Sequence, residues 1–506
     1  MFEASHPFLF FDYFRVPYQV RPPRSRDDTA GLPVHRLAAV GQSRSLLWSP
    51  GDARPGGRSA VSRLGRYRLR DSAFFGYVAL GTAIPAALSA HGRGWEPVET
   101  IFDADSRHAA SVWRDRQGSI FLPFDPGEVM SRFWSESYQA VGRSALPAAA
   151  RAAAVRGYYF ARPALPRPVQ LRLRRQFTRV QGRSSFPAWP AEDSLHNLYA
   201  WLATLIAEFA GRPVPFLDPW PDGRSWALVL THDVETAVGY GDMELLRSPE
   251  RVRGYRSSWN FVGERYPVED ETLRALRDDG CEVGVHGLRH DGRDLASRRL
   301  MEQRLPTMRE FAERWDAVGF RSPATQRKWE LMPQLGFDYD SSYSDTDPYE
   351  PQPGGCCSYW PYFNQAMVEL PMTMPQDHTM FSILQKADAK IWLEKAQYLR
   401  QRQGMVLVLT HPDYARDQRV TDGYEALLDT FQDDDTAWRA LPREVAAWWR
   451  DRAASTIRPD GEGWRIDGPA SGRGRVRLAH PGSGAQCDGP GPRSTVRGGD
   501  RDHGYG

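Results

Sequence analysis

Two carboxylates and a histidine follow one of the most apolar stretches of the chain. Residues 227–230 (ALVL) run directly into Thr231, His232 and Asp233, and Glu235 comes two residues later. An apolar run bounded by polar residues predicts a buried strand, and side chains two apart on a strand share a face. Catalytic groups of α/β proteins gather at the carboxyl ends of strands. The stretch therefore predicts an active site, and a solvated strand end with a turn-forming aspartate is the alternative.

Further histidines follow other apolar runs. His286 comes after one short run, and His411 ends the run MVLVLTH. Together with His232, they are three histidines at corresponding strand ends, so we expect them to converge. His286 and His290 are four residues apart, and if the chain turns helical there, both rings lie on one face and can share a metal ion. Two imidazoles and one carboxylate leave a coordination position for water, which is the pattern of catalytic zinc.

Five short motifs of this region resemble those of the polysaccharide deacetylase superfamily (the NodB-homology domain) and occur in the same order. They are Thr231–Glu235 (THDVE), His286–His290 (HGLRH), Arg321–Pro323 (RSP), Asp338–Ser342 (DYDSS) and Leu409–His411 (LTH). The resemblance covers residues 226–453. It implies a distorted (β/α) barrel, a divalent metal that is usually zinc, and hydrolysis of an acetyl group or a related amide.

The resemblance also implies a role for each matching side chain. His286 and His290 match the metal-binding imidazoles, and Asp233 matches the general base. Arg321 matches the arginine that orients this base, although a purely structural salt bridge is the alternative for it. His411 matches the general acid.

The chain departs from the family pattern at one metal ligand. The usual motif has two adjacent aspartates, but the second position here is Val234, which cannot bind a metal. Glu235 fits a variant in which the carboxylates are spaced by one residue, so Glu235 is the expected metal ligand. The rival assignment makes Asp233 the ligand and leaves another group as the base.

A long segment without periodicity is the candidate for substrate contacts. Residues 345–360 are rich in Pro, Gly and acidic residues, and long irregular loops in compact domains tend to be lids or binding loops. We expect Tyr349 and Trp360 to stack on a sugar, although they could equally cap the core. His378 is expected to line the pocket, and a surface turn is the alternative.

The rest of the chain divides into regions by composition. Residues 1–160 alternate short apolar runs with turn clusters and predict a mixed, strand-rich N-terminal domain. Residues 161–225 are expected to be a linker with one helix over Asp193–Gly211. Residues 226–453 alternate apolar strands with helical stretches, which is typical of α/β folds with parallel βαβ units. Residues 454–506 are low in complexity and are expected to be a largely disordered tail, with a small strand pair over residues 461–478 as an open alternative.

Charge and composition exclude some classes of function. The chain of 506 residues has 65 Lys and Arg against 63 Asp and Glu, which gives no indication of nucleic-acid binding. No apolar run approaches the roughly 18 residues of a membrane span, and the N-terminus lacks the pattern of a signal peptide. The four cysteines match neither a disulfide framework nor a CxxC zinc site. We therefore expect a cytoplasmic protein.

These features together predict a metal-dependent hydrolase acting on carbon–nitrogen bonds other than peptide bonds. The expected reaction removes an acetyl group from an N-acetylated sugar or glycan precursor, with zinc as the expected metal. One alternative is a metal-dependent amidase acting on a small non-sugar amide, and another is a non-catalytic carbohydrate-binding protein on the same scaffold. The expected partner is the carbohydrate or small amide, and the sequence gives no oligomeric state.

Overall fold

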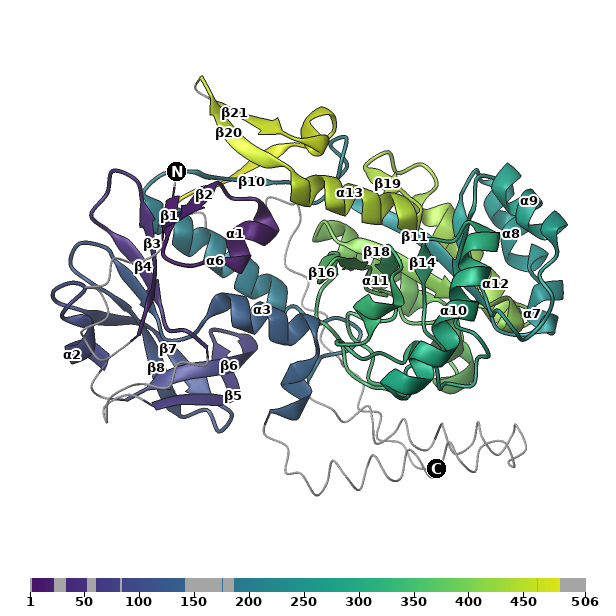
Figure 1. The fold of residues 1–506 in the computed structure, drawn as a ribbon, viewed down its shortest axis with the longest axis horizontal. Helices are drawn as coiled ribbons and strands as arrows, with labels where there is room; N and C mark the ends of the chain where they lie inside the picture. Colours follow the sequence, from purple (N-terminus) through teal and green to yellow (C-terminus); the bar gives the residue numbers. More distant parts are fainter. Residues whose placement is uncertain are drawn as a thin grey trace, which may run out of the picture.

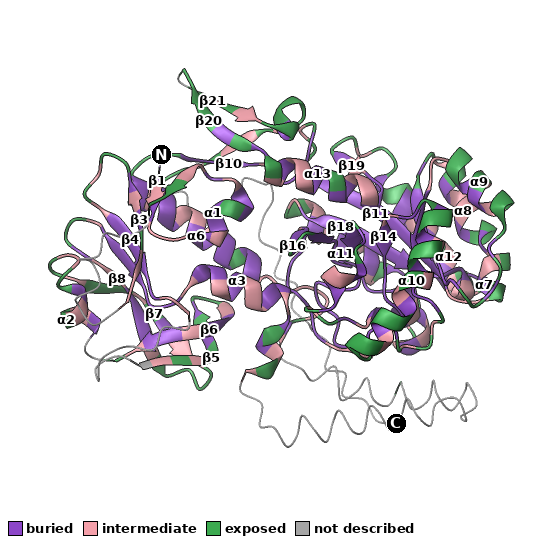
Figure 2. Ribbon diagram, in the orientation of Figure 1, coloured by how far each residue is buried: buried purple, intermediate pink, exposed green. Residues whose placement is uncertain are grey.

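Two sheets, each of nine strands, organise the molecule and lie side by side (Figure 1). The computed structural model describes residues 2–21, 33–51, 61–81, 84–141, 186–461 and 463–482, together with Arg175. Figure 2 shows that the strands of the central sheet are largely buried, whereas several strands of the N-terminal sheet also carry exposed and half-buried residues. No helix in these ranges has the length and apolar character needed to cross a membrane.

The N-terminal sheet is mostly antiparallel and has the order β2-β1-β3-β4-β9-β8-β7-β5-β6. Its strands are β1 (Phe2–Ala4), β2 (Tyr18–Val20), β3 (His35–Ala39), β4 (Ser45–Trp48), β5 (Val61–Leu69), β6 (Ser72–Leu80), β7 (Glu96–Asp103), β8 (His108–Arg114) and β9 (Ile120–Leu122). The helices of this part are α1 (Leu9–Phe14), α2 (Ile84–Leu88), α3 (Pro126–Trp134) and the 3-10 helix η1 (Ser137–Ala140). The predicted strand-rich character is therefore present in the described residues.

Helix α6 (Ser194–Ala210) ends at Gly211, whose φ of 62° is left-handed, as the sequence predicts for a helix stop. The helix packs on the N-terminal sheet instead of standing alone in a linker. The Ser194 hydroxyl accepts a hydrogen bond from the Ala73 backbone N–H at 3.2 Å, and Trp201 Nε1 donates to Glu99 Oε1 at 3.0 Å. The expected linker upstream of residue 186 lies outside the described residues, apart from Arg175.

The central sheet has the order β16-β17-β15-β14-β13-β12-β11-β18, with β19 also paired to β11. Its strands are β11 (Trp226–Val234), β12 (Ser257–Phe261), β13 (Glu282–Val285), β14 (Gly319–Phe320), β15 (Tyr339–Asp340), β16 (Tyr362–Asn364), β17 (Met367–Glu369), β18 (Met405–Thr410) and β19 (Ala437–Arg439). All pairs are parallel except β16 with β17. Every residue of β11 and β18 is buried. One face of β11 meets α8 through His232 and Glu250, and the other meets Arg321 through Thr231 and Asp233.

The helices around the central sheet are α7 (Ala237–Gly241), α8 (Glu244–Val252), α9 (Asp270–Asp278), α10 (Arg298–Trp315), α11 (Lys390–Gln401), α12 (Gln418–Phe431) and α13 (Pro442–Ala454) (Figure 1). The expected barrel is an incompletely closed, curled sheet, since no strand ladder joins β18 to β16. Instead, the Met374 N–H donates to the Leu407 carbonyl at 3.2 Å, and the Thr373 hydroxyl donates to the Met405 carbonyl at 2.7 Å. Pro371 and Pro375 flank this segment, and a proline has no N–H for a ladder.

The C-terminal segment is structured as far as residue 482, where the sequence predicted a largely disordered tail with a small strand pair over residues 461–478 as the alternative. Strands β20 (Thr456–Asp460) and β21 (Gly463–Asp467) form an antiparallel hairpin. Strand β22 (Val476–Ala479) pairs with β10 (Val214–Leu217), which precedes the central sheet. This pairing with a distant strand supplies the hydrogen bonds that the composition of the segment does not predict. The expected disorder of residues 483–506 lies outside the described residues.

The segment expected to be a lid is instead buried against the N-terminal part. The Tyr138 hydroxyl donates to the Gly355 carbonyl at 2.7 Å. Arg327 Nη2 lies 2.6 Å from Glu136 Oε1 and its Nε lies 2.9 Å from Oε2, so a bidentate ion pair crosses the interface. Both side chains are almost fully buried. Residues 345–360 therefore join the two halves of the molecule.

Candidate active site

The candidate site lies where β11, β13 and β18 end. Asp233 is the penultimate residue of β11 and Glu235 directly follows the strand, whereas His286 follows β13 and His411 follows β18. Strand β11 is parallel to β18, with His232 opposite Thr410. The carboxyl ends of parallel strands meet at one edge of the sheet, and this edge brings the four side chains together.

Asp233 is held as a buried carboxylate. Asn260 Nδ2 donates to its Oδ1 at 2.8 Å, and Arg321 Nη1 lies 3.2 Å from the same oxygen. Arg321 is itself held, because its Nε donates to the Ser341 carbonyl at 2.8 Å. Burial opposes ionisation, but His286 and Arg321 outweigh it and lower the pKa of Asp233. The second oxygen, Oδ2, lies 3.6 Å from His286 Nδ1 and faces the cluster.

His286 is oriented with one ring nitrogen available. Its Nδ1 lies 3.0 Å from the Arg321 backbone carbonyl, so Nδ1 carries the proton and donates it. The Nε2 atom is buried and has no hydrogen-bond partner among the described residues. Burial lowers the pKa of His286 to about 4. A neutral imidazole whose other nitrogen donates to a carbonyl is the usual state of a metal ligand.

His290 reaches His286 through an irregular loop, and the helical turn that would have put both rings on one face does not form. Gly287 and His290 both have left-handed backbone, with φ of 68° and 53°. A Cβ on Gly287 would lie 2.3 Å from Asp294 Oδ2 and 2.7 Å from Pro323 Cδ. The two imidazole centroids are nevertheless 5.1 Å apart. Two left-handed residues thus bring the rings together where a helix was expected to do so.

Arg304 of α10 braces this loop. Its guanidinium lies 2.6 Å from Asp291 Oδ2 and 2.5 Å from Asp294 Oδ1. The other carboxylate oxygen of Asp294 accepts the Leu288 N–H at 3.1 Å. The backbone on both sides of His290 is therefore fixed by one buried arginine.

Glu235, His286 and His290 form a set that fits a divalent metal ion. One ligand atom from each lies within 4.8 Å of the other two, and Glu235 Oε1 is 3.0 Å from His290 Nε2. Burial raises the pKa of Glu235, but His290 and His411 lower it well below its usual range. The set thus offers an ionised carboxylate and two imidazoles, and His286 Nε2 is buried without a hydrogen-bond partner among the described residues. This donor set suits zinc.

His411 is held in the protonated, positively charged form, unlike the neutral imidazole of a metal ligand. Its Nδ1 lies 2.6 Å from Asp377 Oδ1, and its backbone N–H donates to Asp377 Oδ2 at 2.7 Å. Burial lowers the pKa of His411, but Asp377, Glu235 and Asp233 outweigh it and raise the pKa to about 10. His411 is therefore a buried imidazolium at neutral pH.

Asp377 and Asn260 were not predicted from the sequence. Asp377 lies in the polar turn before His378, and its side chain caps this turn by accepting the His378 N–H at 2.7 Å. Asn260 lies on β12, a strand whose mixed sequence SSWNF gives little apolar signal. Tyr414 is a third addition, because its hydroxyl lies 3.5 Å from Glu235 Oε2.

The structure separates the three residues expected to contact substrate. The His378 ring is 4.9 Å from Tyr414, whose ring is 5.4 Å from His411, so His378 borders the cluster. Tyr349 packs edge to face on Trp189 at 5.2 Å.

Trp360 is placed elsewhere, and the expectation that it contacts substrate at this site is corrected. Its Nε1 donates to the Gln403 carbonyl at 2.7 Å. Gln403 precedes β18, whereas His411 follows the strand. Trp360 therefore lies at the opposite end of the sheet from the cluster.

His232 does not converge with the other histidines, which corrects a further expectation. Its Nε2 lies 2.7 Å from Glu250 Oε1 and its Nδ1 lies 2.8 Å from Thr410 Oγ1. Because side chains alternate along a strand, the residue before Asp233 faces the other side of the sheet. His232 thus ties β11 to β18 and α8 behind the cluster.

Comparisons with known proteins give structural matches. No family model matches the sequence, and no curated protein matches it. The chain is similar to a putative polysaccharide deacetylase from Mycobacterium smegmatis, with 19% identity, a TM-score of 0.38, and coverage of 48% of this chain and 98% of that chain. It is also similar to a probable polysaccharide deacetylase from Pseudomonas aeruginosa PAO1, with 17% identity, a TM-score of 0.38, and coverage of 48% and 96%. Puue allantoinase matches at 14% identity and a TM-score of 0.37, with coverage of 46% and 92%. The chain is thus similar, over about half of its length, to solved polysaccharide deacetylases and to an allantoinase.

Proposed function

We propose that this chain is a metal-dependent hydrolase of the polysaccharide deacetylase type, and that it removes an acetyl group from an N-acetylated sugar or glycan precursor. One observation carries the proposal. A buried carboxylate (Asp233) and a buried imidazolium (His411) flank a Glu–His–His set, in which His286 Nε2 is buried without a hydrogen-bond partner among the described residues and His290 Nε2 faces the Glu235 carboxylate. The order of the five sequence motifs supports the same reaction.

Glu235, His286 and His290 would hold the metal ion, with zinc preferred by this donor set. When bound, the ion supplies a Lewis acid for the acetyl carbonyl and lowers the pKa of water towards about 7. Glu235 is preferred to Asp233 as the carboxylate ligand, because Glu235 contacts His290 directly. Asp233 Oδ1 is instead occupied by Asn260 and Arg321.

Asp233 acts as the general base in this proposal. Its Oδ2 faces the cluster and, as part of an ionised carboxylate, can accept a proton from the attacking water. Asn260 and Arg321 fix the orientation of the carboxylate and keep it ionised in a buried setting. Positioned proton transfer of this kind contributes roughly 10²- to 10⁴-fold to a rate.

His411 acts as the general acid. The C–N bond breaks when the leaving nitrogen receives a proton, because an amine cannot depart as an anion at neutral pH. Asp377 holds the Nδ1 side of the ring, so the Nε2–H is the proton available to the substrate. Proton acceptance at Asp233 and proton donation at His411 together complete the hydrolysis to acetate and free amine.

Acetate release from purified protein tests the proposal. The panel contains N-acetylglucosamine oligomers, an N-acetylated nucleotide sugar and small non-sugar amides. We expect acetate from the sugars, its loss on chelation, and its return on adding zinc. Asp233→Asn should lower kcat by roughly 10²- to 10⁴-fold, whereas the exposed Asp105→Asn serves as a control with unchanged kcat.

Other results would point to the alternatives. Turnover restricted to the non-sugar amides indicates the amidase. Sugar binding without turnover, unchanged in Asp233→Asn, indicates the non-catalytic binding protein. Full acetate release after metal removal contradicts the proposal.

A further inference from the structure

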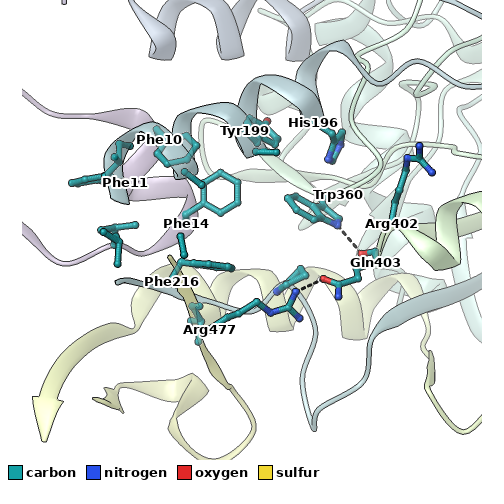
Figure 3. A pocket seen from close by; sticks show the side chains of 18 of the residues that line it. Phe10, Phe11, Phe14, His196, Tyr199, Phe216, Trp360, Arg402, Gln403 and Arg477 are labelled. Atoms are coloured by element: carbon teal, nitrogen blue, oxygen red, sulfur yellow. Dashed lines mark hydrogen bonds between the residues drawn. The ribbon is translucent and has the colours of Figure 1, made fainter. Parts of the chain in front are cut away.

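A cavity lies between α1, α6 and the central sheet, and β22 closes one side of it (Figure 3). Its volume is about 270 Å³. The lining side chains used below are Phe14 of α1, His196, Tyr199 and Ala203 of α6, Phe216 of β10, Trp360, Arg402, Gln403, Arg452 of α13 and Arg477 of β22. They come from the N-terminal part, the central sheet and the C-terminal segment, so one cavity touches all three.

The cavity is separate from the candidate active site. Gln403 lies just before β18, and His411 lies just after it. Eight residues at about 3.3 Å each place these two positions roughly 25 Å apart along the strand. The cavity therefore lies at the amino ends of the strands, and the metal ligands lie at the carboxyl ends.

Aromatic rings form the apolar part of the cavity. The Phe14 ring is 6.0 Å from Trp360 at 77° and 6.4 Å from Phe216 at 89°. Tyr199 and Trp360 are parallel within 4°, with centroids 6.1 Å apart. Figure 3 shows Phe14, Phe216 and Trp360 around the space. Ring edges and faces in this arrangement suit a flat apolar group.

His196 places a hydrogen-bond donor in the same wall. The residue is 7% exposed, and its Nε2 accepts the Tyr359 N–H at 3.1 Å. Burial lowers the pKa of His196 well below its usual value, so the ring is neutral and its one proton lies on Nδ1. Among the described residues, Nδ1 has no hydrogen-bond acceptor. Because Nδ1 is not among the buried atoms left without a partner, this donor is open to the cavity, where the acceptor of a ligand can reach it.

The charges of the lining point to an anionic acceptor. The lining holds three arginines and no Asp or Glu. Arg477 is paired with Asp218 at 2.7 Å, and Arg402 is paired with Asp193 at 3.2 Å.

Arg452 supplies a positive charge that no carboxylate neutralises directly. Its guanidinium donates to the backbone carbonyls of Tyr13, Leu217 and Asp218. It makes no ion pair among the described residues, although it is 3% exposed. The cavity therefore combines an aromatic body with a net positive wall.

We propose that this cavity binds a small aromatic carboxylate. The ring would lie among Phe14, Tyr199 and Trp360, and the carboxylate would accept the His196 Nδ1–H beside the arginines. A 150 Å³ cavity accommodates benzene, so a cavity of about 270 Å³ suits roughly ten heavy atoms. A ring with a short acid side chain has this size.

Calorimetric titration of the full chain with 3-phenylpropionate and with 3-phenylpropan-1-ol tests the proposal. The two probes share the ring and differ in charge. We expect the acid to bind at least tenfold more tightly than the alcohol, and to raise the thermal unfolding midpoint because it binds the folded state. Equal binding of both probes, or no saturable binding of the acid, would overturn the proposal.

Variants locate the binding. Ala203→Leu fills the cavity from α6 and should weaken binding of the acid at least tenfold. Ala447→Leu makes the same substitution at an exposed position of α13 and should leave the affinity for the acid unchanged. Arg477→Gln should weaken binding of the acid and leave binding of the alcohol unchanged, because the two probes differ only in charge. Wild-type affinity in Ala203→Leu would contradict this location.

Discussion

At the scale of single residues, Asp233 and His411 are equally hidden from solvent but carry opposite charges. They are 2% and 4% exposed. The difference comes from their neighbours, because Asn260 and Arg321 surround the first and Asp377 faces the second. Two titratable groups whose environments move their pKa values apart are suited to act as base and acid. The motifs predicted that these residues meet at one edge of the sheet, and the structure adds the neighbours that set their charge.

Replacing Asp377 with Asn tests the role of His411. The carboxylate raises the pKa of His411 to about 10, and an acid catalyst is lost as pH rises through its pKa. Without the carboxylate this pKa falls, so the alkaline limb of the kcat profile should move to lower pH by about one to three units. The measurement is kcat against pH for both proteins. An unmoved alkaline limb would exclude Asp377 from this role.

At the scale of elements, the sequence predicts the strands that carry the site but not the loops that shape it. The apolar runs before Asp233 and His411 predict β11 and β18, because strands buried on both faces are uniformly apolar. Strand β12 has polar and aromatic residues and was missed, and Asn260 was missed with it. The HGLRH motif suggested a helix by its spacing alone. Left-handed backbone at Gly287 depends on packing against Pro323, which lies far away in the sequence.

Gly287→Ala should disrupt the metal loop. The added Cβ would meet Asp294 and Pro323 at 2.3 and 2.7 Å, at a φ of 68°. Gly292→Ala is a matched control, since it has the same φ but meets only the flexible end of Gln326 at 3.0 Å. Left-handed strain alone costs about 1 to 3 kcal/mol, so both variants should lose stability in urea unfolding. Only Gly287→Ala should also bind zinc more weakly, and equal zinc affinity in the two variants would contradict this account of the loop.

At the scale of the whole molecule, the sequence predicts the regions but not how they join. Composition suggested a linker before residue 225 and a disordered tail after residue 454. In the structure, α6 packs on the N-terminal sheet, and β22 pairs with β10. Such long-range pairings leave no local signal in the sequence. The composition of residues 345–360 likewise predicted a lid or binding loop. The contacts that bury this segment come from residues far away in the sequence, such as Tyr138, and leave no local signal.

The Glu136–Arg327 pair is predicted to stabilise the contact between the two halves. Glu136→Gln removes one charge and leaves the Arg327 guanidinium buried without its partner. Breaking a buried pair in this way costs about 3 to 5 kcal/mol. Chemical denaturation of the variant should show this loss, whereas Asp270→Asn, which breaks an exposed pair with Arg314, should leave the unfolding midpoint unchanged. A Glu136→Gln variant as stable as the wild type would show that the pair contributes little to the contact.

Metal content of the purified chain tests the central claim most directly. Wild-type protein loaded with zinc and passed through a desalting column should retain one ion per chain by elemental analysis. His290→Ala and Glu235→Gln should lose it, Asp233→Asn should keep it while losing activity, and the exposed His480→Ala should behave as wild type. Wild-type protein that retains no metal, or His290→Ala that retains a full equivalent, would contradict a metal centre at this strand edge.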